Sequence, residues 1–214
     1  MITLHGFGAE FGLPEISPLD TRTRIRPKMA HCKQQANRPT SPKGPLPYFD
    51  DGLGALQRAL AWALERMIEH HVYWALVGAR WVDPENFAKG PAHFFDAVPE
   101  HLREKLREDA QFRVAENYLL SGLGRHAPEA GVDLALRSLF SLSVQLGDKP
   151  YLMGDTPCGT DATAFGALAG ILTPFFVSTL REETEKFRNL TAYVDRMMFQ
   201  YYPDFAWVPL RQAA

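Results

Sequence analysis

The feature that most constrains the fold is an abrupt change in hydrophobic pattern at Gly54. Before this glycine, short apolar runs are broken by glycine and proline, which is typical of strands and loops. After it, apolar residues recur at intervals of three and four, a spacing that places them on one face of a long helix. The first of them are Leu56, Leu60, Leu64, Met67, His71 and Trp74. The pattern predicts a small α/β region of about 50 residues followed by an all-helical bundle.

Two short segments of the N-terminal region have the composition of strands. Residues 2–7 are mostly apolar or β-favouring, and glycines follow them. The stretch 37–47 is so rich in proline that it predicts loop or extended chain. A second short strand is expected at 46–49, where apolar residues resume.

A helix is expected to begin at Ser17 and Pro18 and to run to about His31. The serine hydroxyl can accept from the first-turn amides, and proline in the first turn loses no hydrogen bond. Pro27 is a candidate kink, because its ring cannot continue the amide ladder.

Four helices are expected after the long one. The first opens at Pro99, carries interleaved charges and is predicted to expose a solvated face. The second runs from Pro128 to Gly147, and the others cover about 160–172 and 189–202.

Composition excludes several classes of function. The 23 basic and 25 acidic residues of the 214 leave a net charge of −2, so nothing favours binding to nucleic acid or to an anionic membrane. The longest apolar stretch, 167–177, is well short of the ~20 residues that span a bilayer. With two cysteines, Cys32 and Cys158, and no signal-peptide pattern, we expect a cytoplasmic protein.

No metal site is expected. His70 and His71 are adjacent in a predicted helix and therefore point in different directions, and no second ligand pair has suitable spacing. His71 is expected on the apolar face, whereas Tyr73 and Trp74 are expected to line either the core or a pocket.

The segment GDKPYLMGDTPCGTDATAFGALAGIL resembles the signature of the glutathione S-transferase C-terminal domain. In that domain a turn leads into a buried helix whose capping position is an aspartate. Here Asp161 stands three residues after Cys158, where a carboxylate can accept the N-cap amide. Because a thiol is a weak acceptor, Asp161 is expected to carry most of this structural cap. Cys158 is expected to be a buried thiol, although a helix start can also acidify one.

Other strings resemble the failed-axon-connections branch of this superfamily, which is related to metaxins. They are ITLHGFG, FGLPEISP, PKGPLPY, ALAWALERMIEHHVYWALV, ARWVDPENF, GLGRH and NLTAYVDRMM, and they span almost the whole chain in order. The resemblance implies a thioredoxin-like domain that binds glutathione as co-substrate. It also implies a helical domain whose first helix lines a pocket for a small hydrophobic electrophile, here with Tyr73, Trp74 and Arg80. Arg80 could instead pair with an acid on the surface.

The same resemblance assigns glutathione-binding roles in the N-terminal region. Phe7, Leu46 and Pro47 fall at the glutathione-binding positions, with a cis peptide bond expected at Pro47. Ser17 falls near the group that stabilises the glutathione thiolate as the catalytic residue. Its simpler interpretation is a plain helix N-cap.

A thioredoxin-like domain needs roughly 80 residues for its strands, helices and connections. Only about 50 precede the long helix, and Tyr48 is followed directly by FDDGL, where the family pattern continues through a hairpin, a serine turn and a helix. We interpret this as an internal deletion. The missing turn would hold the γ-glutamyl carboxylate at a helix start, so glutathione binding is expected to be weak or absent.

The sequence therefore predicts an α/β plus all-α protein. A truncated thioredoxin-like domain (1–50) precedes a helical bundle like the glutathione S-transferase C-terminal domain (51–214). Three interpretations stay open: a glutathione transferase with an impaired site, a non-enzymatic binding or scaffold protein of metaxin-like type, or a degenerate or wrongly predicted gene product. Homodimerisation through the N-terminal domain is usual for the fold group.

Overall fold

The computed structural model describes residues 8–36, 50 and 52–210. Within these ranges β pairing is limited to two isolated bridges, Glu10 with Leu13 and Tyr151 with Gly154. The strands expected at 2–7 and 46–49 lie outside the described residues, so the thioredoxin-like sheet stays a prediction.

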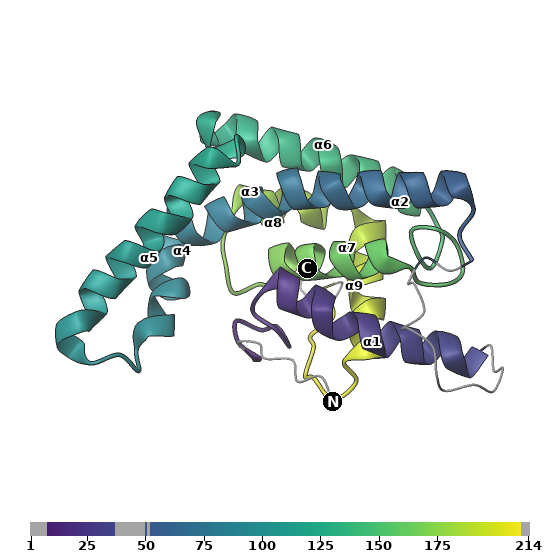
Figure 1. Cartoon of the computed structure of the whole chain (residues 1–214), viewed down its shortest axis with the longest axis horizontal. Helices are drawn as coiled ribbons and strands as arrows, with labels where there is room; N and C mark the ends of the chain where they lie inside the picture. The colour runs from purple at the N-terminus through teal and green to yellow at the C-terminus, as the bar shows by residue number, and fades with distance from the viewer. Residues whose placement is uncertain (1–7, 37–49, 51, 211–214) are drawn as a thin grey trace.

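The described chain is a helical assembly (Figure 1). Its elements are α1 (Pro18–Ala36), α2 (Ala55–Met67), the π-helical turn η1 (Ile68–Val72), α3 (Tyr73–Val77), the π-helical turn η2 (Gly78–Val82), α4 (Pro84–Lys89), the 3₁₀ turn η3 (Pro91–Phe95), α5 (Glu100–Leu120), the 3₁₀ turn η4 (Leu123–Arg125), α6 (Pro128–Leu146), α7 (Gly159–Leu172), α8 (Thr179–Glu185) and α9 (Arg188–Tyr201). The helices expected after Pro99, after Pro128 and at 160–172 and 189–202 are confirmed as α5, α6, α7 and α9. Helix α1 continues through Pro27 to Ala36, beyond its expected end.

Helix α7 is the centre of the molecule, and every one of its residues is buried. Figure 1 shows α1 on one side of it and α2 and α6 on the other. Its sequence is apolar on all faces, as expected of a fully enclosed helix. Glycine permits the closest approach, because a Cβ added at Gly166 would lie 2.5 Å from the backbone oxygen of Pro18.

Helix α2 runs alongside α7 in the same direction. The Thr160 hydroxyl donates to the Ala61 carbonyl at 3.1 Å, so the start of α7 lies level with the second turn of α2. The residues of α2 before Ala61 therefore precede α7. Leu56 and Leu60 are 83% and 37% exposed, so the apolar face of this helix is not buried at its start.

Elements α2, η1, α3 and η2 follow one another without a break and form one long helix from Ala55 to Val82. Its two π-helical turns change which residues face α7. The buried residues Ile68, Val72, Leu76 and Arg80 are each four apart. Four residues are more than one turn of an α-helix, so such a row would drift around a regular helix. The wider π turns η1 and η2 offset that drift. As a result Arg80 still faces inward near the end of the helix.

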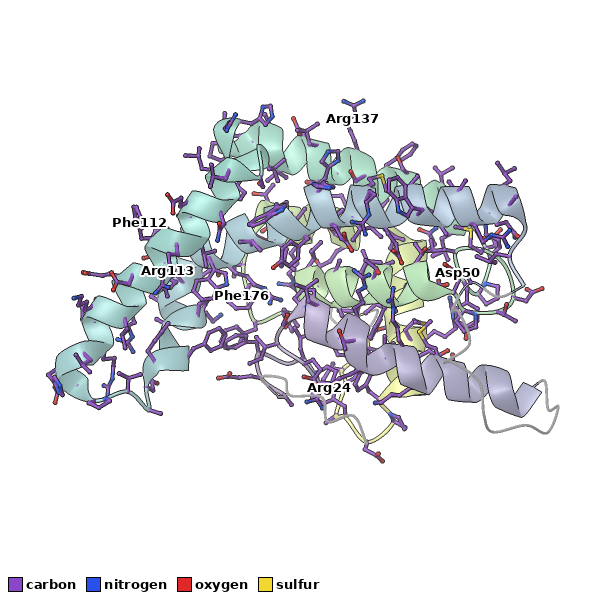
Figure 2. All side chains as sticks on the ribbon, in the orientation of Figure 1. Arg24, Asp50, Phe112, Arg113, Arg137 and Phe176 are labelled. Atoms are coloured by element: carbon purple, nitrogen blue, oxygen red, sulfur yellow. The ribbon has the colours of Figure 1, made fainter. Side chains whose placement is uncertain are left out.

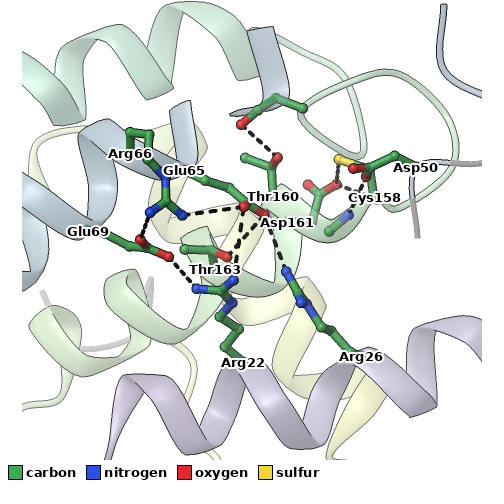
Figure 3. Close-up of polar contacts among 12 residues, drawn as sticks. Arg22, Arg26, Asp50, Glu65, Arg66, Glu69, Cys158, Thr160, Asp161 and Thr163 are labelled. Carbon is green, nitrogen blue, oxygen red and sulfur yellow. Dashed lines mark hydrogen bonds and ion pairs between the residues drawn. The ribbon is translucent and has the colours of Figure 1, made fainter. Parts of the chain in front are cut away.

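Helix α1 joins the same core as the bundle, into which it buries Ile25 and Met29. It also contacts the bundle through a group of ion pairs (Figure 3). Arg26 lies 3.4 Å from Glu65, and Arg22 pairs with Glu69. Partly exposed pairs of this kind contribute about 1 kcal/mol or less each, so burial does more to hold α1 in place.

Candidate functional site

A cavity of about 550 Å³ lies where the start of α1 meets the end of the long helix, η3 and α5. Its lining is mostly aromatic and aliphatic: Phe11, Ile16, Ser17, Pro18, Tyr73, Trp74, Leu76, Val77, Arg80, Trp81, Pro91, Phe94, Phe95, Val114 and Asn117. The structure thus brings Ser17, Tyr73, Trp74 and Arg80 to one cavity, although Ser17 is far from the other three in the sequence.

Ser17 stands at the entry to α1 and at the edge of the cavity at once. Its carbonyl accepts the Thr21 amide at 2.9 Å, closing the first turn of the helix. The positive end of the helix macrodipole therefore points toward this side of the cavity. The geometry is compatible with both the helix-entry role and a site role for Ser17.

Arg80 is the one basic residue among the described residues that line this cavity, and it is only 6% exposed. Its guanidinium donates to the carbonyl of Ile16 at 3.1 Å and to that of Gly170, and it lies 4.8 Å from the centre of the Phe176 ring. Burial lowers the pKa of Arg80 to about 10, and the neighbouring Tyr73 opposes this shift in part. At neutral pH the arginine therefore still carries its charge.

A cluster of phenylalanines, the aromatic wall, borders the cavity, and Phe11 and Phe94 are the members of the cluster that line it. The Phe11 ring lies 4.7 Å from that of Phe175, 5.2 Å from Phe176 and 5.6 Å from Phe94, measured between centroids. Figure 2 shows Phe176 between the η3 end of the molecule and the start of α1. Phe11 has φ 54°, a left-handed conformation that is unusual for a bulky residue and that concentrates at functional sites. The Thr173 hydroxyl donates to its carbonyl and helps to hold it there.

Cys158 and Asp161 lie at the other end of α7, away from this cavity (Figure 3). Asp161 is 0% exposed and accepts the amide of Cys158 at 2.8 Å, the amide of Leu152 at 2.9 Å and the Tyr193 hydroxyl at 3.1 Å. Burial, together with the Asp161 charge, raises the pKa of Cys158 to about 12. The thiol therefore stays protonated at neutral pH and has the character of a buried structural group.

The two adjacent histidines, His70 and His71, differ in their surroundings. Nδ1 of His71 lies 2.9 Å from the Ser138 hydroxyl, and His70 is exposed. No group of three or more potential metal-binding side chains occurs within the described ranges.

Phe7, Leu46 and Pro47 lie outside those ranges, so their glutathione-binding roles stay predictions. In the part of the chain that the structure describes, we find no helix with both the length and the apolar character to cross a membrane.

Comparison with known proteins identifies the helical domain. Residues 135–197, which include α7 and most of α6 and α9, match the family model described as glutathione S-transferase, C-terminal domain. The chain is also 26% identical over 240 aligned positions to an isoprene-epoxide–glutathione S-transferase of Rhodococcus sp. strain AD45, covering 94% of this chain and 99% of that protein. The chain therefore contains a helical domain of the glutathione S-transferase C-terminal type.

The chain is also similar to two proteins whose names state no enzymatic activity. It is 29% identical to failed axon connections of Drosophila melanogaster and 31% identical to metaxin-1 of Macaca fascicularis. These alignments cover 74% and 75% of the chain, but only 41% and 53% of the two relatives. The chain thus spans about half the length of these two proteins.

The alignment with the Rhodococcus transferase has more positions than this chain has residues. It has 240 positions, whereas the chain has 214 residues, so the transferase contains residues with no counterpart here. The difference agrees with the internal deletion that the sequence predicts, although the alignment figures do not locate it.

Proposed function

We propose that this protein is a non-enzymatic binding or scaffold protein of metaxin-like type, built on the glutathione S-transferase fold, with a weak or absent glutathione site. One observation carries the proposal: α1 ends at Ala36 and α2 begins at Ala55, which leaves 18 residues between them. A hairpin and a further helix need roughly 25 residues or more. The turn and helix start that would hold the γ-glutamyl carboxylate do not fit in this length.

The relatives support this choice. Failed axon connections and metaxin-1 match about three-quarters of the chain. We infer accordingly that residues 1–50 are the remnant of a thioredoxin-like domain, that 51–214 form the binding domain, and that the cavity beside Arg80 is its ligand site. A cytoplasmic location and homodimerisation stay predictions.

A second candidate is a glutathione transferase. It is favoured by the name and near-complete coverage of the Rhodococcus relative and by the place of Ser17 at the cavity. In that function the Ser17 hydroxyl and the positive end of α1 would stabilise the glutathione thiolate. The thiolate would attack a small hydrophobic electrophile such as an epoxide, held beside Tyr73 and Trp74.

Measured turnover separates the two candidates. With millimolar glutathione and a small alkyl epoxide, we expect no rate above the uncatalysed reaction, because the thiol is not held in place. The variants for comparison are Ser17→Ala and Thr23→Ala, the second removing an exposed hydroxyl from the same helix. Saturable turnover that is lost in Ser17→Ala and kept in Thr23→Ala would establish the transferase instead.

A further inference from the structure

We propose that the cavity beside Arg80 binds a small amphipathic organic anion, with a carboxylate at the guanidinium and an apolar body along the aromatic wall. The inference rests on the proposed binding function and names the class of ligand. It follows from three properties of the cavity: an uncompensated buried charge, an unused donor, and a lining without acids.

The charge of Arg80 has no acidic partner among the described residues. Among the side chains that the structure describes, no Asp or Glu oxygen lies within 4.0 Å of its guanidinium, whereas Arg22 of α1 and Arg66 of α2 do pair with glutamates. The stretches 1–7 and 37–49 contain no Asp or Glu, and the acids whose side chains are not described are Asp20 and Asp51. Because an isolated buried charge is costly, a ligand that brings a negative charge here is favoured.

One nitrogen of the guanidinium also lacks a hydrogen-bond partner among the described residues. Two of its amino groups donate to the carbonyls of Ile16 and Gly170, and these bonds fix its position. Nε is buried and has no hydrogen-bond partner within the described part of the chain. Guanidinium is a strong donor to carboxylates, whereas neutral carbonyls compensate little of its charge.

The rest of the cavity selects an apolar body. The described residues of its lining include no Asp or Glu, and Ser17, Tyr73 and Asn117 are the main polar ones besides Arg80. The positive end of α1 points to the same space, so the local potential favours an anion. A volume of about 550 Å³ is in the range of small-molecule sites.

A matched pair of probes tests the proposal directly. The carboxylate is 4-phenylbutyrate and the neutral analogue is 4-phenylbutan-1-ol, each titrated into the whole chain by calorimetry. We expect the carboxylate to bind at least tenfold more tightly than the alcohol, with a preference that falls as salt is added. Equal binding of the two probes, or binding of neither, would overturn the proposal, and neither result depends on a variant.

Variants then locate the site. Arg80→Gln keeps a hydrogen-bond donor and removes the charge, so the preference for the carboxylate should fall below threefold while the alcohol still binds. Arg113→Gln removes an exposed charge from α5 and should leave the preference unchanged (Figure 2). If Arg80→Gln does not fold, Val114→Trp, which fills the cavity from α5, should abolish binding of both probes. Undiminished binding in Val114→Trp would place the ligand elsewhere.

Probe binding and glutathione turnover together distinguish a failure of the anion site from a failure of the proposed function. Equal affinity for acid and alcohol, with no glutathione turnover, would remove the anion site and leave the binding protein. A tenfold preference together with saturable glutathione turnover would keep the anion site and overturn the non-enzymatic function.

Discussion

Replacing Asp161 with alanine is expected to lower the free energy of unfolding by about 4 kcal/mol. The carboxylate accepts two backbone amides, those of Leu152 and Cys158, and all three residues are buried. Without it these donors have no partner where water cannot reach them, and each such donor costs about 1–3 kcal/mol. The Tyr193 hydroxyl keeps a hydrogen bond in the variant, because it also donates to the backbone carbonyl of residue 161 at 3.0 Å.

Denaturant unfolding followed by circular dichroism measures this effect. Asp155→Ala is the matched control, because Asp155 is exposed in the turn just before α7. It should change stability by no more than about 0.5 kcal/mol. Asp161→Asn retains one acceptor and should give an intermediate loss. A loss below about 1 kcal/mol for Asp161→Ala would show that the cap contributes little.

Replacing Gly166 with valine is expected to destabilise the protein by about 3 kcal/mol and to displace the start of α1. A Cβ at this position would lie 2.5 Å from the Pro18 backbone oxygen, a distance that side chains do not reach without movement of the chain. Since α7 is enclosed on all sides, the segment that can move is the beginning of α1. The cavity would change with it, because Ser17 and Pro18 line its edge.

Hydrogen exchange followed by mass spectrometry distinguishes local from global effects. In Gly166→Val, the amides of α1 should lose protection by tenfold or more, whereas those of α9 should change much less. Gly54→Ala is the control, since its added Cβ meets nothing closer than 3.7 Å. Unchanged protection of α1 would mean that its contact with α7 does not hold it.

Proline and capping signals were enough to predict the larger helices of the bundle. Pro99 and Pro128 each precede or open a helix, and the Cys158–Asp161 spacing marks the start of α7. The short helices α4 and α8 did not stand out, because six or seven residues are too few to establish a helical period. The exposure of Leu56 and Leu60 depends on where α7 begins beside α2, which periodicity within α2 cannot reveal.

The sequence predicted only some of the residues of the candidate site. The family resemblance assigned Ser17 to the glutathione site and Tyr73, Trp74 and Arg80 to the co-substrate pocket, and all four line one cavity. The aromatic wall was missed because its phenylalanines, Phe11, Phe94, Phe175 and Phe176, come from separate segments that share no periodic pattern. The unpartnered Nε of Arg80 depends on the contacts of three elements and is visible only in the structure.

In the proposed function, the connection between α1 and α2 is too short to form the turn that binds glutathione. Calorimetric titration of the whole chain with reduced glutathione measures the consequence. We expect no saturable binding, or a dissociation constant of about 1 mM or weaker. A version with a family-like hairpin and helix inserted after Tyr48 should bind glutathione more tightly than the natural chain. A low-micromolar dissociation constant for the natural chain would contradict this proposal.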